Sequence, residues 1–438
     1  MNILILDGSP AGDEAGVRIA GNLLDLLATK GHQTEHAVLR DKTIANCNGC
    51  FQCWLKTPGI CAIDDDNRDL VAKYIQSDLV IALTPVTFGA FSPELKKFAD
   101  HLIQTISPFF CRVNGETHHM KRYERYPGFI SIGWLQGPDD AQEKIFRHLF
   151  YRNTINFYTE KDACGILYST MGTEEIRESL EGLLHKAESG KNGNYRQFSA
   201  IPEFCASTSA DSRVRSATVL VGSPRMVKST SAALGGYIAE RLEEHGVRTE
   251  TFQLYKVSGN PDRTRAMLES IDKTDLVLLA FPLYIDSIPA PVLSIMRTIK
   301  EHRQNKAVNG RFAAIANCGF IEAQHNENAL ASCAVFAKQS GFNWMGSVSI
   351  GGGEGLVHGR PLRELGGPAI PYKKNLDLAA AALAAGHPVP DEARKQLAKP
   401  FTPGWIYRTI GSMGWKKEAR KNGILQQISA RPYQKVPA

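Results

Sequence analysis

The sequence predicts an α/β protein made of two tandem units, each a doubly wound, five-stranded parallel sheet with helices on both faces. The chain has 438 residues, 43% of them hydrophobic and 22% charged, which is ordinary for packed globular domains and long enough for two. The string ILILDGSP at 3–10 recurs as TVLVGSP at 218–224. The apolar runs LVIAL (79–83) and LVLLA (276–280) are nearly continuous, as expected of strands buried on both faces.

The repeat continues beyond these strings. In each half the GSP string leads into a helical pattern that ends near a glycine, Gly31 or Gly246, and a short alternating strand follows. Residues 77–103 then match 274–300, each a buried strand, a loop with proline and an aromatic residue, and an amphipathic helix. Later strands are expected at 128–133 and 165–169, and at 312–318 and 347–350. Five strands per half correspond to two flavodoxin-like domains.

The spacing of the repeat sets the predicted domain boundaries. Gly222 follows Gly8 by 214 residues but Pro282 follows Pro85 by 197, so the first half carries 17 additional residues between its second and third strands. That interval holds a cysteine-rich insertion at about 41–65. We predict a first domain over 1–205, a second over 206–365 and a C-terminal helical extension over 366–438. The mixed stretch 191–212 is the predicted linker.

Composition excludes several classes of function. The net charge is +6, and no Lys/Arg stripe with interleaved aromatic residues indicates nucleic-acid binding. No apolar run approaches the roughly 18 residues that a membrane span requires. The N-terminal residues are interpreted as a strand and not as a secretory signal, and nine cysteines without such a signal favour a reducing cytoplasm over a disulfide framework.

The GSP loops are candidate phosphate sites. Each lies between a strand and a helix, where backbone amides and the positive end of the helix dipole attract anions. The second loop adds hydroxyls and two cations, whereas the first has Asp13 and Glu14 where a phosphate would lie. The candidate ligands are Ser9 in the first half and Ser223, Arg225, Lys228, Ser229, Thr230 and Ser231 in the second.

A second loop follows the third strand of each half, where it should face the ring of a flavin. An aromatic side chain and backbone amides at this place can stack on the ring and hydrogen-bond its edge. As a lone feature, such a loop is equally well a turn that leads into a helix. The candidates are Pro85, Val86, Thr87, Phe88 and Gly89 in the first half and Pro282, Leu283, Tyr284 and Ile285 in the second.

These motifs resemble a known family. The GSP string, CNGCFQCWLKTPGICAIDDD (47–66) and TPVTFGAFSPELKKFADH (84–101) are similar to the NAD(P)H-dependent FMN reductase and iron–sulfur flavoprotein family. The resemblance is strongest over 1–105 and 216–300 and leaves the last 70 or so residues unexplained. It implies FMN as cofactor, NAD(P)H or a similar electron donor, and a homodimer or higher homo-oligomer.

Four cysteines are clustered in the insertion. Three are separated by two residues each and the fourth follows after seven, a spacing close to that of [4Fe–4S] ligands and unlike two separated zinc knuckles. The alternative is a cysteine-rich loop without a cluster, packed as a lid by Phe51 and Trp54. The candidate metal ligands are Cys47, Cys50, Cys53 and Cys61.

The sequence therefore predicts an FMN-dependent oxidoreductase that passes electrons from NAD(P)H through FMN to a small-molecule or protein acceptor. Because the cofactor carries out the chemistry, no catalytic acid–base residues are assigned. Two alternatives stay open. In the first alternative, the chain is a non-enzymatic electron-transfer protein with FMN and an iron–sulfur cluster. In the second, one of its domains is degenerate and has only a structural role.

Overall fold

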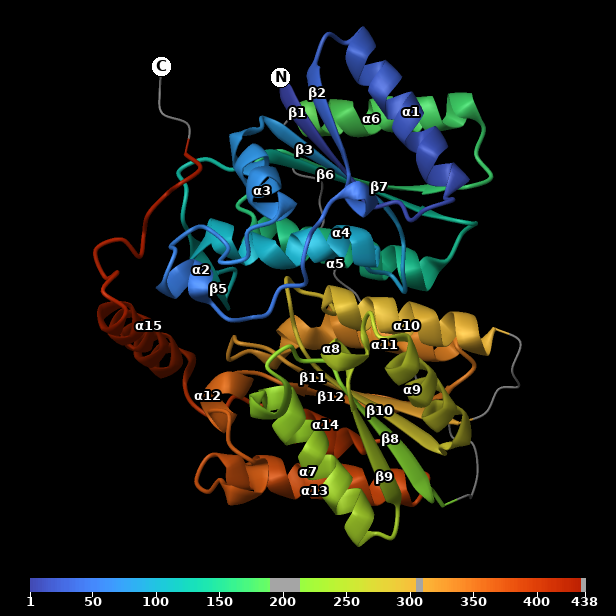
Figure 1. The fold of residues 1–438 in the computed structure, drawn as a ribbon, viewed down its shortest axis with the longest axis vertical. Helices are drawn as coiled ribbons and strands as arrows, with labels where there is room; N and C mark the ends of the chain where they lie inside the picture. Colours follow the sequence, from blue (N-terminus) through green and yellow to red (C-terminus); the bar gives the residue numbers. More distant parts are fainter. Residues whose placement is uncertain (190–212, 305–309, 435–438) are drawn as a thin grey trace. The chain divides into compact units, whose positions relative to one another are not determined.

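The computed structural model describes residues 1–189, 213–304 and 310–434 (Figure 1). The chain divides into two compact units, one comprising Met1–Ile201 with Arg408–Ala438 and the other Pro202–Tyr407. The predicted linker 191–212, and with it the predicted boundary after residue 205, lies outside the described residues.

The first unit contains a five-stranded parallel sheet in the order β2-β1-β3-β6-β7. The five predicted strands are all present, and residues of β3 and β6 are buried on both faces, as their continuous apolar runs predict. The strands are β1 (Asn2–Asp7), β2 (Gln33–Val38), β3 (Leu79–Pro85), β6 (Gly128–Leu135) and β7 (Asp162–Tyr168).

Helices cover both faces of this sheet (Figure 1). Helices α1 and α6 lie side by side on one face, where Ile19, Leu23 and Leu180 pack against the strands. On the other face lie α3, α4 and α5. The helices are α1 (Glu14–Thr29), α2 (Gln52–Leu55), α3 (Asp66–Gln76), α4 (Pro93–Ala99), α5 (Asp140–Asn156) and α6 (Thr173–Glu188), with short 3-10 turns η1 (Leu39–Asp41) and η2 (Asp100–Thr105).

A β-hairpin that the sequence analysis did not predict follows η2. Strands β4 (Ile106–Val113) and β5 (Glu116–Lys121) pair antiparallel and form a separate two-stranded sheet. The turn is Asn114-Gly115, and both residues have positive φ, 51° and 91°. Asn-Gly is the pair that favours such a turn.

The second unit has the order β12-β11-β10-β8-β9, again all parallel. In chain order, both sheets therefore follow 2-1-3-4-5, the doubly wound order of flavodoxin-like domains. The predicted tandem fold is confirmed. The strands are β8 (Ser216–Val221), β9 (Arg248–Gln253), β10 (Leu276–Pro282), β11 (Arg311–Asn317) and β12 (Asn343–Ile350).

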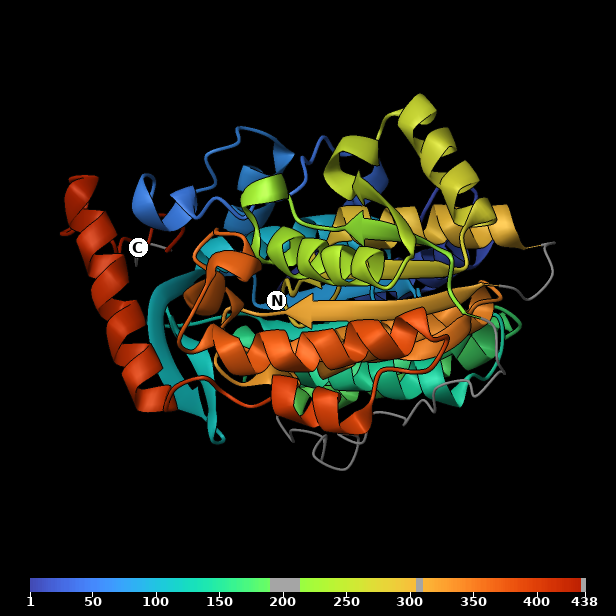
Figure 2. The ribbon, with the colours of Figure 1, turned by 90° about the horizontal axis from the view of Figure 1, so that it is seen from below.

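In the second unit α7 and α13 pack together on one face of the sheet, with α14 beside α13 (Figure 2). Helix α13 follows the last strand of its sheet as α6 does in the first unit. The other face carries α9, α10 and α11 (Figure 1). The helices are α7 (Thr230–Glu244), α8 (Leu254–Val257), α9 (Pro261–Lys273), α10 (Ala290–Arg303), α11 (Glu327–Gln339), α12 (Gly353–Val357), α13 (Ala369–Ala384) and α14 (Asp391–Leu397), with 3-10 turns η4 (Met226–Lys228), η5 (Ala323–Asn326) and η6 (Leu362–Glu364).

The residues after 365 are shared between the units. Helices α13 and α14 belong to the second unit, whereas helix α15 (Gly404–Lys421) continues from Arg408 into the first. Among the described helices, none is both long and apolar enough to cross a bilayer.

Candidate functional site

Both GSP loops leave the carboxyl end of the first strand of their sheet in the same way. The Gly8 amide donates to the Leu83 carbonyl and the Gly222 amide to the Ala280 carbonyl, each at 2.8 Å. A Cβ at Gly8 would lie 2.6 Å from the Leu95 Cβ, and a Cβ at Gly222 2.6 Å from Val292 Cγ2. Each loop therefore passes so close to the helix after the third strand that glycine is required.

The loops after the third strands also share one conformation. Thr87 and Ala90 exchange two backbone hydrogen bonds of 2.9 Å, and Tyr284 and Ser287 exchange two of 3.0 and 3.1 Å. In each turn two central residues have positive φ, which defines the same tight reversal. They are Phe88 and Gly89 in the first unit and Ile285 and Asp286 in the second.

The side chains of the two turns differ in exposure. In the first unit Phe88 is buried, and the turn packs so closely on α5 that a Cβ at Gly89 would lie 2.6 Å from Ile145 side-chain atoms. In the second, Ile285 stands at the place of Phe88 and is half-buried, as is Tyr284 before it. The other predicted ring contacts are also half-buried. They are Pro85, Val86, Thr87, Pro282 and Leu283.

A carboxylate occupies the N-terminus of α1. Asp13 is the N-cap, and its side chain accepts hydrogen bonds from the Gly16 amide (3.0 Å) and from the Trp134 indole (3.1 Å). The predicted ligand Ser9 is 1% exposed and donates its hydroxyl to Asp7 at 2.5 Å. The first phosphate loop is thus filled by the chain's own anion.

The N-terminus of α7 carries a neutral cap instead. Ser229 accepts a hydrogen bond from the Ala232 amide at 3.1 Å and donates to the Met226 carbonyl at 2.6 Å. The first turn of α7 has no acidic residue. Lys228 and Arg225 are both exposed beside it, so cations border this helix end. The positive end of the α7 dipole and the neighbouring cations are favourable for binding a phosphate.

Behind this cap, an asparagine fixes the loop. Asn317, at the end of β11, donates to the Ser231 hydroxyl (2.9 Å) and to the Phe281 carbonyl (3.0 Å). The Ser231 hydroxyl therefore links α7 to the sheet, and Ser223 and Thr230 are buried as well. Asn317 was missed from the sequence, although a polar residue that ends the apolar run FAAIA was a usable signal.

The glycine-rich segment after β12 packs on the same helix end. A Cβ at Gly351 would lie 2.2 Å from the Ile321 carbonyl oxygen, and a Cβ at Gly353 2.9 Å from Thr230 Cγ2. The Glu354 carboxylate forms an ion pair with Arg225 and lies 3.5 Å from the Thr230 hydroxyl. A phosphate in this loop would therefore compete with Glu354 for Arg225.

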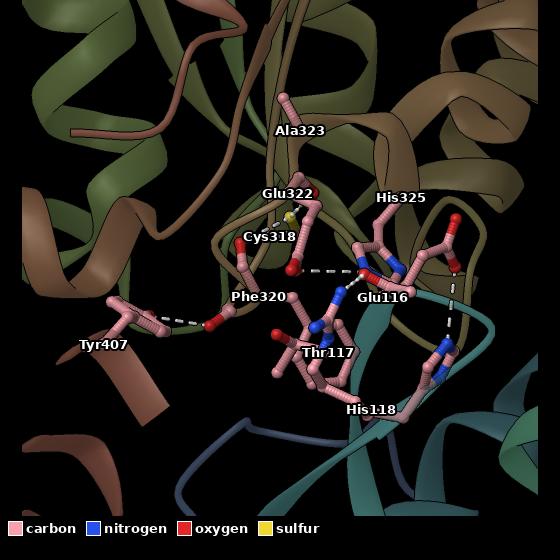
Figure 3. A network of polar contacts seen from close by, with 12 residues as sticks. Glu116, Thr117, His118, Cys318, Phe320, Glu322, Ala323, His325 and Tyr407 are labelled. Atoms are coloured by element: carbon pink, nitrogen blue, oxygen red, sulfur yellow. Dashed lines mark hydrogen bonds and ion pairs between the residues drawn. The ribbon is translucent and has the colours of Figure 1, made fainter. Parts of the chain in front are cut away.

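The loop after β11 is held by its own hydrogen bonds (Figure 3). The Cys318 thiol lies 3.3 Å from the Phe320 carbonyl oxygen and 3.6 Å from that of Glu322, and Tyr407 donates to the Gly319 carbonyl at 2.7 Å. Burial raises the pKa of Cys318 to about 12. This cysteine is thus a buried structural thiol.

A buried histidine braces the turn that carries Tyr284. His325 lies 3.8 Å from the Asp286 carboxylate, which belongs to that turn, and 3.7 Å from the Glu322 carboxylate. The Phe320 ring covers the imidazole at a centroid distance of 4.7 Å (Figure 3). The turn that carries Tyr284 therefore packs against His325, a buried polar residue that was not predicted from the sequence.

The four clustered thiols are gathered in the first unit. Burial raises the pKa of Cys53, and the other three cysteines raise it further by charge repulsion, so all four lie within electrostatic reach. Burial also raises the pKa of Cys47, to about 12, and that of Cys61. Cys50 is exposed. Within residues 1–189, 213–304 and 310–434, no three His, Cys, Asp or Glu side chains are arranged to hold a metal ion.

Three contacts fix Cys61, the cysteine farthest along the segment. Its amide donates to the Gln104 side chain at 2.9 Å, and its carbonyl accepts from Arg68 at 2.9 Å. Its sulfur lies 3.6 Å from His101 Nδ1, and Nε2 of that ring lies 2.8 Å from the Ala45 carbonyl oxygen. His101 and Gln104 were not among the residues predicted from the sequence.

Asp7 provides a pH-dependent contribution to stability. Burial alone would raise the pKa of Asp7, but hydrogen bonds from His36 (3.1 Å) and Ser9 outweigh it and lower that pKa. A carboxyl with a lowered pKa stabilises the fold above its unfolded pKa of about 3.9, and this contribution is lost as pH falls through the lower folded value.

We therefore expect Asp7→Asn to lower the unfolding free energy by about 1–3 kcal/mol at neutral pH. The difference from wild type should shrink as pH falls below about 4, measured by urea unfolding at a series of pH values. A difference that stays constant down to pH values of about 3 would contradict the assignment.

A protein-family model matches both units. The family model described as NADPH-dependent FMN reductase matches residues 1–158 and 216–355, one stretch in each unit. Each stretch contains a GSP loop and the turn after the third strand. The residues after 355 are not matched.

Curated relatives match over a shorter length. The chain is 33% identical over 100 residues to an iron–sulfur flavoprotein of Methanocaldococcus jannaschii, covering 23% of this chain and 51% of that protein. It is 27% identical over 103 residues to an iron–sulfur flavoprotein of Methanosarcina thermophila, covering 24% and 53%. The chain thus spans about half the length of these relatives.

Among solved structures, a putative quinone reductase from Klebsiella pneumoniae aligns with a TM-score of 0.33 and 12% identity. The alignment covers 43% of this chain and 84% of that one. The two sheets of order 2-1-3-4-5, their paired loops and the family match in both units agree with one another. The chain belongs to the NADPH-dependent FMN reductase family and carries two copies of its flavodoxin-like domain.

Proposed function

We propose that this protein is an FMN-dependent oxidoreductase that takes electrons from NAD(P)H and passes them to a small-molecule or protein acceptor, with FMN held by the second unit. The N-terminus of α7 supports this proposal most directly. It combines a hydroxyl cap at Ser229, an acid-free first turn and the neighbouring Lys228, which suits a phosphate monoester.

The residues around this helix end fit FMN in kind. Ser229 and the amides of the first turn of α7 would hold the phosphate, and Arg225 would contribute once released from Glu354. The backbone from Leu283 to Ile285 and the ring of Tyr284 would bind the edge and face of the flavin. The bound flavin supplies hydride and electron transfer, and the residues named here bind and orient it.

Features of the first unit also favour placing FMN in the second unit. Asp13 places a carboxylate where the phosphate would lie, and Phe88 is buried. Its other candidates, Ser9, Pro85, Val86, Thr87 and Gly89, lie in loops with the same backbone hydrogen bonds as those of the second unit, but without such a helix end. On this proposal the first unit serves as a scaffold and carries the cysteine segment.

The cysteine segment is proposed to hold a [4Fe–4S] cluster through Cys47, Cys50, Cys53 and Cys61. Four free thiols at this spacing match such a cluster in the kind and number of donors. Two relatives are named iron–sulfur flavoproteins. Without the cluster, the segment is a packed lid. With a cluster but without NAD(P)H turnover, the protein would be an electron carrier.

One experiment on anaerobically purified protein tests the proposal. We expect flavin bands, FMN released on denaturation at about one per chain, and rapid bleaching of those bands by NADH or NADPH. We also propose that the protein is a homo-oligomer and that it is cytoplasmic. Size-exclusion chromatography of the same sample would check the oligomeric state.

Two outcomes would change the proposal. Flavin that NAD(P)H does not reduce, but that other reductants do, would favour the electron-carrier alternative. Protein that stays free of FMN after incubation with an excess of FMN would overturn the proposal altogether.

A further inference from the structure

The segment from Arg408 to Gln434 lies beyond both family matches, yet it packs on the first unit. Helix α15 docks on the β4–β5 hairpin. Arg408 donates to the Thr117 hydroxyl at 3.3 Å, and the Lys416 ammonium lies 5.8 Å from the centre of the Phe109 ring. A Cβ at Gly411 would lie 2.6 Å from the Phe110 ring, so glycine permits this close approach.

The helix then reaches the cysteine segment through an aromatic cluster. Trp415 packs edge-on against Phe51 and Trp54, with ring centroids 5.3 and 5.1 Å apart. Phe51 and Trp54 stack on each other at 5.0 Å. These residues flank Cys53, which is 9% exposed and packs in the same cluster. Trp415 therefore covers the side of the segment that carries Cys53.

After the helix, the chain crosses the segment a second time. The buried Arg122 guanidinium donates to the carbonyls of Ile428 (3.1 Å) and Ala430 (2.8 Å). Pro432 packs against Gly59, where a Cβ would lie 2.6 Å from the proline ring. The Gln76 side chain, at the end of α3, donates to the Tyr433 carbonyl at 3.5 Å.

We propose that residues 408–434 form a strap that covers the side of the cysteine segment that carries Cys53 and limits access of solvent and oxidants to that thiol. The contacts come from two separate stretches: Trp415 on α15 packs on Phe51 and Trp54, and the tail packs on Gly59 through Pro432 and is held by Arg122. The buried Arg122 guanidinium binds two carbonyls of the tail. If the tail were displaced, Arg122 would lose these two partners, and an unpaired buried guanidinium is unfavourable. The tail is therefore held firmly in place. The strap's control of thiol access stands by itself, and its protection of a cluster rests on the proposed function.

The test uses full-length protein freed of metal under anaerobic conditions, with alkylation by iodoacetamide followed by mass spectrometry. We expect Trp415→Ala and Arg122→Gln to speed alkylation of Cys53 about tenfold, because a buried thiol reacts through local opening. Met413→Ala is the matched control, since Met413 is 65% exposed on the same helix. Trp415→Phe, which keeps a ring, should restore most of the protection.

Cys333, fully buried in the second unit, reports on global unfolding in the same samples. Alkylation of Cys53 at the wild-type rate in both variants, or equal acceleration at Cys53 and Cys333, would overturn the strap. In iron-loaded protein, Trp415→Ala should release iron faster in air. Wild-type protein that takes up no iron would refute the cluster, while the alkylation result would still decide the strap.

Discussion

Replacing Ser229 with aspartate should abolish FMN binding while leaving the second unit folded. Aspartate is as good an N-cap as serine, so the bond to the Ala232 amide should be kept. The change places a carboxylate near the flavin phosphate. At about 4 Å and an effective dielectric constant near 20, each pair of unit charges repels by about 4 kcal/mol. We therefore expect FMN affinity to fall at least about a hundredfold, measured by fluorescence titration.

Two substitutions control for this experiment. Ser229→Asn caps the helix without a charge and should retain FMN. Asp13→Ser in the first unit removes the corresponding carboxylate and should leave the existing FMN in place. If Ser229→Asp bound FMN normally, and changes at Ser9 and Thr87 released it instead, the first unit would be the flavin domain.

Replacing Cys50 with alanine should remove the iron from anaerobic protein. Wild type should be brown and contain about four irons per chain, as a [4Fe–4S] cluster requires. Cys50 is the exposed member of the four, so its loss costs little packing. Both sheets should remain intact, because the insertion has no counterpart in the second half of the repeat. Iron analysis and circular dichroism measure the two effects.

Cys111→Ala is the matched control, because Cys111 lies in the same unit on β4, outside the segment. It should leave the iron content unchanged. Wild-type anaerobic protein that is colourless beyond its flavin bands would refute the cluster and leave the four thiols as part of a packed lid.

The tandem fold could be predicted because its signals are local and repeated. A parallel strand covered on both faces must be apolar throughout, which marked 79–83 and 276–280 as buried strands. A loop that passes close to a neighbouring helix requires glycine, which placed Gly8 and Gly222 at equivalent points. The same logic located the turns with Phe88 and Tyr284.

The contacts that complete the candidate sites could not be predicted, because they join residues far apart in sequence. Nothing near Asp13 indicates that Trp134 binds it, and nothing near Ser231 indicates Asn317. His101 reaches Cys61 across 40 positions. Asn114-Gly115 was a local signal for the hairpin and was missed, because the second half of the repeat offered no equivalent.

The division of the first unit has a consequence for how the protein is made. Residues 408–434 leave the ribosome after the whole second unit, and domains generally fold in the order of their synthesis. Throughout translation of roughly 200 intervening residues, at about 5–20 residues per second, the cysteine segment lacks the cover of Trp415 and the tail. On the proposed function, metal insertion would have an interval of about 10–40 seconds before Trp415 docks, so chain synthesis itself would time the maturation of the proposed cluster.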